Sequence, residues 1–305
     1  MHTTKCFQNH LGPWLIESNW FTAAVAAIKS GTWKAEGERE IKPQAVAEGW
    51  KLITHNGHPA GDVLYAVNPA GVAVMEINGP MMKAQSKFGG CSTMLVRQAL
   101  RTSVSDKQVG SIMLNIESPG GTTAGIAELA HEIRETNQQK PVHAHFTDIG
   151  ASAAVWAGVQ ARRVTANAMA LVGSIGVYAV LVDDSKQMEM AGIKLHLISS
   201  GAQKGAGADG VVTEEMKSDT QKHVDAINDV FLSEIALGRN MTPKQVRELA
   251  TGQVWMASEA KKLGLIDGVM SFDHALAALS AKTKLPADRP RAARAAAQMK
   301  IAEMN

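Results

Sequence analysis

Between residues 71 and 198, short apolar runs alternate with stretches of helical periodicity, and this alternation constrains the fold more than any other feature. The apolar runs predict strands at residues 72–77, 111–116, 141–146, 163–165, 171–172 and 194–198. The periodic stretches predict helices at residues 92–102, 122–138, 152–160 and 183–191. Strands and helices that alternate at this spacing build a mostly parallel sheet with helices packed on it. The sequence therefore predicts an α/β fold.

The sequence on either side of this region has a different character. Residues 1–70 hold most of the tryptophans, and we expect a helical N-terminal extension in which Ser18 or Asn19 caps one helix. Residues 71–280 form the expected main domain. Its last part is helical, with a long helix that begins after Thr213 and a capping box at Thr242. The composition of residues 281–305, rich in alanine, arginine and lysine, predicts a basic, exposed C-terminal tail with one helix over 291–303.

Composition argues against several classes of partner. The net charge of +2 gives no reason to expect nucleic acid or an acidic membrane surface. The most apolar window, residues 169–182, is too short to span a bilayer. The two cysteines are far apart, and no cluster of histidine, cysteine and carboxylate has zinc spacing, so we expect no metal and no cofactor. These features are typical of a soluble protein in a reducing compartment.

Ser152 is the candidate nucleophile. It lies at a predicted strand-to-helix junction between Gly150-Ala151 and Ala153-Ala154, where small neighbours let a substrate backbone approach. Upstream, Gly120-Gly121 follows a predicted strand, and the N–H groups of Gly121 and Ser152 could form an oxyanion hole. The alternatives are a serine that only caps a helix and an ordinary glycine-rich loop.

Lys204 is the candidate general base. A free lysine has a pKa of about 10.4 and stays protonated at neutral pH, but burial can lower the pKa by several units. No acidic residue stands within four positions of Lys204. Ser174, which follows Gly173, could hydrogen-bond the amine and orient it. A serine activated by a neutral lysine is sufficient for acyl transfer, although a surface lysine and a structural serine remain open readings.

The order of these motifs resembles one known family. Similarity to the signal peptide peptidase A family, and within it to the prohead proteases of tailed phages and prophages, is carried by Ser118-Pro119-Gly120-Gly121, Ala151-Ser152, Gly173-Ser174-Ile175-Gly176-Val177 and Ser200-Gly201-Ala202-Gln203-Lys204. Residues 13–17 and 252–267 also fit the phage branch. The resemblance covers residues 71–270.

The resemblance implies a Clp-protease-like, crotonase-type fold with a Ser/Lys dyad. Ser152 would be the nucleophile, Lys204 the base, Gly121 and Ser152 the oxyanion donors, and Ser174 an aid to the lysine. It further implies self-association into a ring, and cleavage of scaffold, capsid or portal proteins in the host cytoplasm during procapsid maturation. One departure is Ala153-Ala154, since many members have glycine after the nucleophile. Another is the lack of a membrane anchor, which favours the phage branch.

Other functions stay open at this stage. No histidine occurs between Phe146 and Leu195, which argues against a Ser-His-Asp triad. A crotonase-like enzyme acting on acyl-CoA would use the same oxyanion geometry without a nucleophile, and Ser152→Ala would leave it active. A non-catalytic capsid-assembly protein would keep the fold as a scaffold, with Lys204 exposed and protonated.

Overall fold

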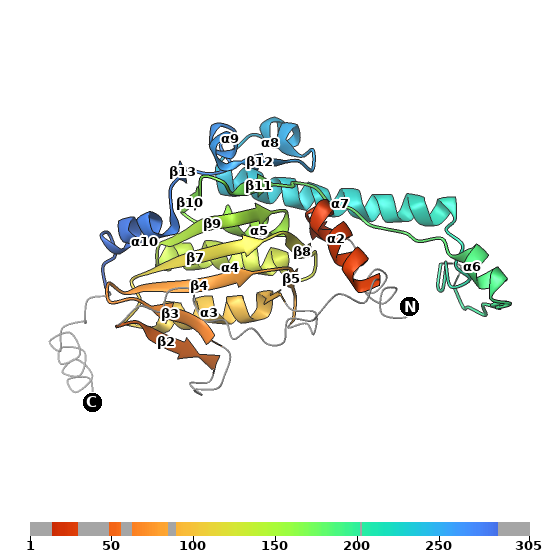
Figure 1. Cartoon of the computed structure of the whole chain (residues 1–305), viewed down its shortest axis with the longest axis horizontal. Coiled ribbons are helices and arrows are strands. Elements are labelled where there is room, and N and C mark those ends of the chain that lie inside the picture. Colours follow the sequence, from red (N-terminus) through yellow and green to blue (C-terminus); the bar gives the residue numbers. More distant parts are fainter. Residues whose placement is uncertain (1–13, 30–48, 56–62, 85–89, 202, 286–305) are drawn as a thin grey trace, which may run out of the picture.

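The computed structural model describes residues 14–29, 49–55, 63–84, 90–201 and 203–285, and they form a mixed α/β fold (Figure 1). Among these residues, nine strands make one sheet in the order β12-β11-β9-β7-β4-β3-β2, with β10 beside β9 and β13 beside β10. Its central strands are parallel and comprise β4 (Val72–Asn78), β7 (Ser111–Ser118) and β9 (Val142–Ala151).

Beyond β9 the sheet divides, and its outer edges are antiparallel. The first half of β9 pairs in parallel with β10, and its end pairs in parallel with β11. The edge pairs β11/β12, β3/β4 and β2/β3 are antiparallel. The bounds are β2 (Lys51–Thr54), β3 (Val63–Val67), β10 (Arg163–Ala166), β11 (Leu171–Gly173), β12 (Val254–Met256) and β13 (Gly268–Val269).

Helices cover both faces of the sheet (Figure 1). Successive side chains of a strand point to opposite faces. Ala73 and Met75 of β4 therefore join the main core with α3 and α4, whereas Val72 and Val74 pack with α10. The helices that cover the sheet are α3 (Thr93–Ser105), α4 (Ile126–Gln139), α5 (Ala153–Gly158) and α10 (Phe272–Ser280).

A second, four-stranded sheet stands at the carboxyl edge of the parallel strands. Its order is β1-β8-β5-β6, with β1 (Trp14–Ile16), β5 (Met81–Met82), β6 (Cys91–Ser92) and β8 (Gly120–Thr122). Since β5 follows β4 and β8 follows β7, each continues from the carboxyl end of a central strand. The helix α2 (Ser18–Lys29) follows β1 and is the predicted N-terminal helix, although Ser18 is its first residue and not its cap.

Residues 179–230 project away from the domain, and we call them the arm (Figure 1). The arm contains α6 (Ser185–Met190) and the first part of α7 (Glu214–Arg239). The rest of α7 docks on α5, where the rings of Trp156 and Phe231 stack with centroids 4.9 Å apart. Such a pair adds about 0.5–1.5 kcal/mol beyond the area it buries. The arm therefore has a firm attachment point.

The helical signals in the last part of the chain are confirmed. The side chain of Thr213 caps α7 by accepting from the Met216 N–H, and Thr242 forms a complete capping box with Gln245. The remaining helices are α8 (Pro243–Leu249) and α9 (Ala257–Lys262). None of the helices described is both long enough and apolar enough to cross a membrane.

The structure corrects two expectations. The strands of the sheet are not confined to the region after Gly71, where the sequence predicts them, because β2 and β3 lie before that residue and extend the sheet through β4. Residues 194–198 form no strand, since this part of the arm is exposed and has no neighbouring strand to pair with. The helix expected over 291–303 lies outside the described residues. The domain limits at 71 and 280 stay a prediction.

Candidate active site

Ser152 occupies a sharp turn between β9 and α5. Its backbone has φ 56° and ψ −116°, and such left-handed backbone in a residue other than glycine costs on the order of 1–3 kcal/mol. The side chain is 1% exposed, and Oγ has no hydrogen-bond partner among the described residues. A strained strand-to-helix turn that presents a serine hydroxyl is the arrangement of a nucleophile elbow.

The glycine pair of β8 packs directly against this turn. Gly120 has φ 99°, and a Cβ on it would collide with the Leu15 carbonyl oxygen and lie 2.9 Å from the Cβ of Ser152. A Cβ on Gly121 would collide with the backbone of Met81 in β5. Only glycine therefore allows β8 to approach the serine this closely. The structure brings Gly121 into the neighbourhood of Ser152, as the motifs suggest.

Ser174 lies beside Ser152 because two parallel strands end together. Gly173, the last residue of β11, pairs with Ala151, the last residue of β9. Ser174 is buried and has φ 53°, so the two serines share an unusual left-handed backbone at the same edge of the sheet. The structure thus gathers three of the four expected site residues.

The expected oxyanion hole needs a correction. The backbone N–H of Ser152 donates to the Gly173 carbonyl over 2.8 Å, because the β9/β11 pairing continues for one residue. This N–H is therefore not free to bind a substrate oxygen. The next N–H along the chain belongs to Ala153, the first residue of α5, where helical N–H groups have no partner inside the helix. Sequence reasoning missed Ala153 because it treated the alanine only as a small neighbour.

Lys204 does not lie with the other three residues in the isolated chain. It belongs to the segment of the arm between α6 and α7 (Figure 1). Its side chain is exposed. The expected burial beside Ser152 is therefore not met within one chain. The physical reason is that, among the described residues, no other part of the protein covers the segment between α6 and α7, so the amine stays open to water.

The outer arm is unusually apolar for an exposed segment. Met190 is 87% exposed and Ile198 is 97% exposed. Other large apolar side chains exposed on the arm are Val180, Leu181, Val182, Ile193, Leu195, Leu197, Val211 and Val230. A contiguous set of exposed apolar residues marks an interaction surface. The surface that bears Lys204 is thus suited to burial against another protein.

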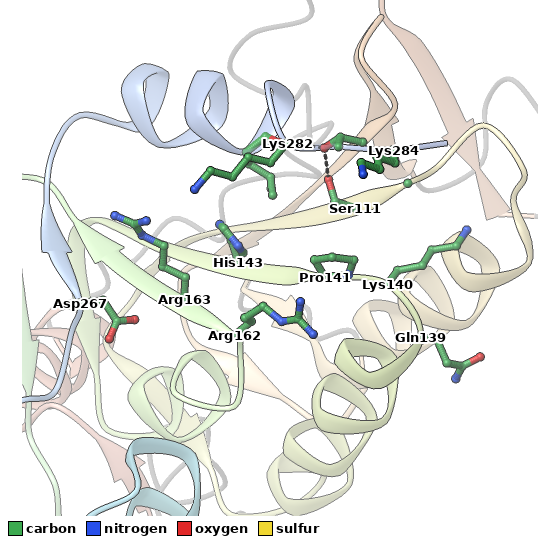
Figure 2. Close-up of a pocket in the computed structure, with 13 residues that line it drawn as sticks. Ser111, Gln139, Lys140, Pro141, His143, Arg162, Arg163, Asp267, Lys282 and Lys284 are labelled. Carbon is green, nitrogen blue, oxygen red and sulfur yellow. Dashed lines mark hydrogen bonds between the residues drawn. The ribbon is translucent and has the colours of Figure 1, made fainter. Parts of the chain in front are cut away.

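A separate cavity lies away from the serine. This cavity, of about 900 Å³, opens where β7, β9 and β10 begin (Figure 2). Ser152 follows the other end of β9, at the opposite edge of the sheet. The lining of the cavity is rich in basic side chains, which are Lys140, His143, Arg162, Arg163, Lys282 and Lys284. Within the described chain, no group of three or more histidine, cysteine or carboxylate side chains is arranged to hold a metal ion.

His143 in this cavity predicts a pH effect on stability. Burial, with the nearby cations Arg163, Arg162 and Lys282, lowers the pKa of His143 to about 4, although Asp267 acts in the opposite direction. A histidine in an unfolded chain has a pKa of about 6.5. Between that pKa and the pKa of His143 in the folded protein, the unfolded chain binds the extra proton, so the free energy of unfolding falls as the pH drops. Urea unfolding from pH 7 to pH 4 should show a smaller loss of stability in His143→Gln than in the wild type.

His223, which is exposed on the arm, provides the matched control. His223→Gln should follow the pH dependence of the wild type. If His143→Gln and the wild type lose the same stability across this range, the buried-histidine explanation is wrong.

Comparison with known proteins adds a second line of evidence. Residues 134–286 match the family described as Peptidase family S49. The chain is 30% identical over 182 residues to a putative signal peptide peptidase of Enterococcus faecium, an alignment that covers 59% of this chain and 53% of that protein.

Two phage proteins are also similar. The identity is 28% over 243 residues to the head-tail preconnector protein of Enterobacteria phage P21, covering 78% of this chain and 48% of the relative. It is 26% over 213 residues to the capsid assembly protease C of Escherichia phage lambda, covering 68% and 48%. The chain spans about half the length of these three relatives.

Proposed function

The chain belongs to peptidase family S49, and from this premise we propose that it is an endopeptidase in which Ser152 is the nucleophile and Lys204 the general base. The family has the Clp-protease/crotonase-like fold, to which the mostly parallel sheet and its flanking helices conform. Capsid-assembly proteins are the proposed substrates, by analogy with the capsid assembly protease of phage lambda. Cleavage would take place in the host cytoplasm, inside the assembling procapsid.

One observation carries the proposal: the hydroxyl of Ser152 is buried on a strained backbone, with no hydrogen-bond partner in the part of the chain that the structure describes. An unsatisfied buried hydroxyl and a left-handed serine each cost folding free energy. A residue that only capped α5 would bond an N–H of the first turn, yet Ser152 makes no side-chain cap. The cost is explained if the hydroxyl is reserved for a substrate carbonyl.

The proposed chemistry is acyl transfer in two steps. Lys204 accepts the proton of Ser152 as Oγ attacks the scissile carbonyl, and the oxyanion rests on the N–H groups of Gly121 and Ala153. The protonated lysine then gives its proton to the leaving amine, and water resolves the acyl-enzyme by the same route. Ser174, at the same edge, would hydrogen-bond and orient the amine.

The exposed position of Lys204 is reconciled with this chemistry by assembly. We place Lys204 of one copy beside Ser152 of the adjacent copy in a ring, with the apolar arm buried between the copies. Burial at that interface would remove water from the amine and lower its pKa, because desolvation disfavours the charged form. A head-to-tail contact of this kind closes into a ring when the rotation between copies permits.

A non-catalytic scaffold is the alternative, because an exposed Lys204 is what that reading expects. A fluorophosphonate probe separates the two functions, since it bonds only to an activated serine. Intact-mass and peptide analysis of the full-length chain should find one phosphonyl group on Ser152 after prolonged labelling. Ser152→Ala should take up none, while Ser174→Ala, changed at the neighbouring left-handed serine, should still be labelled. Absence of any adduct in the wild type would favour the scaffold.

A further inference from the structure

The N-terminal strand β1 is held by backbone on both of its edges. On one edge it pairs antiparallel with β8, with Leu15 opposite Gly121. On the other edge, Trp14 donates its N–H to the Tyr178 carbonyl over 2.8 Å and accepts from the Tyr178 N–H over 3.2 Å. Residues 14–16 therefore fill a groove between β8 and Tyr178, as an inserted strand does.

Strand β1 lies close to the candidate nucleophile in this position. The backbone N–H of Glu17 donates to the Pro119 carbonyl over 2.7 Å, so Glu17 and Pro119 form a hydrogen-bonded pair of the β1/β8 ladder. Hydrogen-bonded pairs recur at every second residue of an antiparallel ladder, so the pair formed by Leu15 and Gly121 is also in a hydrogen-bonded position. The Leu15 carbonyl oxygen would also collide with a Cβ on Gly120, a position only 2.9 Å from the Cβ of Ser152. The Leu15 carbonyl thus faces the N–H group expected to bind a substrate carbonyl.

The side chains of β1 alternate between two apolar environments. Leu15 is 0% exposed and joins the main core. Trp14 and Ile16 point the other way, into a cluster that contains Tyr178 and two residues of α2, Phe21 and Val25. The ring of Phe21 contacts both Trp14 and Tyr178, with centroids 5.2 and 5.7 Å apart. Backbone pairing combined with alternating side-chain pockets is how extended peptides are recognised.

We propose that β1 is a pseudosubstrate: it occupies the groove that receives the substrate backbone, and the chain must release it before cleaving another protein. The proposal rests on the proposed function of Ser152. A segment tethered to its own groove acts at an effective concentration on the order of millimolar, so a free protein at lower concentration competes poorly. An efficient substrate would then present an extended stretch with a large aliphatic residue where Leu15 lies.

A reversible lock on β1 tests this. Trp14 and Thr122 are direct partners in a non-hydrogen-bonded position, where Cα atoms lie about 4.5 Å apart, within the range a disulfide can bridge. The double variant Trp14→Cys/Thr122→Cys, made in the full chain with Cys6→Ser, should form this bridge when oxidised. Hydrolysis of fluorescein-labelled casein, an unfolded protein, should be at least tenfold slower in the oxidised form than in the reduced form. Thr122→Cys alone should respond equally to both conditions.

A binding measurement separates failure of this inference from failure of the catalytic proposal. With Ser152→Ala added, a fluorescent peptide with the sequence of residues 12–18 should bind the reduced form at least tenfold more tightly than the oxidised form, measured by anisotropy. A difference in binding without hydrolysis in either form would refute the catalytic role but support the pseudosubstrate. Equal hydrolysis in both forms, or equal or absent peptide binding, would overturn the pseudosubstrate.

Discussion

Replacing Ser152 with alanine is expected to lower kcat for peptide hydrolysis by a factor on the order of 10⁴ to 10⁶, as removal of a serine nucleophile does in hydrolases of this chemistry. The groove and the N–H groups of Gly121 and Ala153 remain in the variant, so substrate still binds and a small residual rate persists. Single-turnover cleavage of labelled casein, with the variant in excess, measures the chemical step directly.

The same change should leave the fold intact or strengthen it. Oγ of Ser152 is buried and has no partner in the described chain, so removing it relieves an unsatisfied polar group. The midpoint of urea unfolding should be equal to or higher than that of the wild type, the usual sign of a residue kept for activity and not for stability.

Ser174→Ala is the matched control for this prediction, because Ser174 shares the left-handed backbone and the same sheet edge. Loss of its hydroxyl should slow the reaction by no more than about a hundredfold, since its proposed part is to orient the base. If Ser174→Ala lost as much activity as Ser152→Ala, or if Ser152→Ala kept a tenth of the wild-type rate, the nucleophile would have to be reassigned.

Local signals were enough for most of the fold. The buried strands β4 and β7 contain short apolar runs, β9 begins with apolar and polar residues in alternation, and the starts of α7 and α8 carry the cap residues Thr213 and Thr242. In both cases the information lies within a few residues of the element it specifies. The family is confirmed as well. It could be predicted because its motifs consist of small residues that let backbone approach the serine closely.

Contacts between distant segments could not be read in this way. Nothing in Trp14-Leu15-Ile16 itself says that it pairs with Gly120-Gly121, which lie over a hundred residues later. The hydrogen bond from the Ser152 N–H to the Gly173 carbonyl also depends on the register of two strands, β9 and β11. The sequence therefore suggested the Ser152 N–H as an oxyanion donor, although the strand pairing already uses it.

The arm shows a limit of a different kind. Leu195 and Leu197 alternate with polar residues, as in a half-buried strand, yet both are exposed. Such a pattern predicts burial without saying whether the covering surface belongs to the same chain. For residues 194–198, and for the neighbouring Lys204, we infer that it belongs to another copy.

Replacing Lys204 with alanine should abolish detectable hydrolysis in every preparation that contains only this variant. No other group at the Ser152 edge is proposed to take the proton, so the loss should approach that of Ser152→Ala, on the order of 10⁴-fold or more. Lys217, an exposed lysine on α7 that pairs with Glu214, offers the matched control. Lys217→Ala should keep the wild-type rate within about twofold, since exposed ion pairs contribute little.

A mixture of two inactive variants then tests where Lys204 acts. If each site takes Ser152 from one copy and Lys204 from its neighbour, a ring assembled at random from Ser152→Ala and Lys204→Ala chains contains intact pairs at about a quarter of its sites. Refolding the two together should therefore restore about a quarter of the wild-type rate, while either variant refolded alone stays inactive. A pair contributed by one chain predicts no recovery in the mixture, because every chain lacks one partner. Recovery thus requires that the exposed arm deliver its lysine to another copy, a placement that would also cover its exposed apolar side chains.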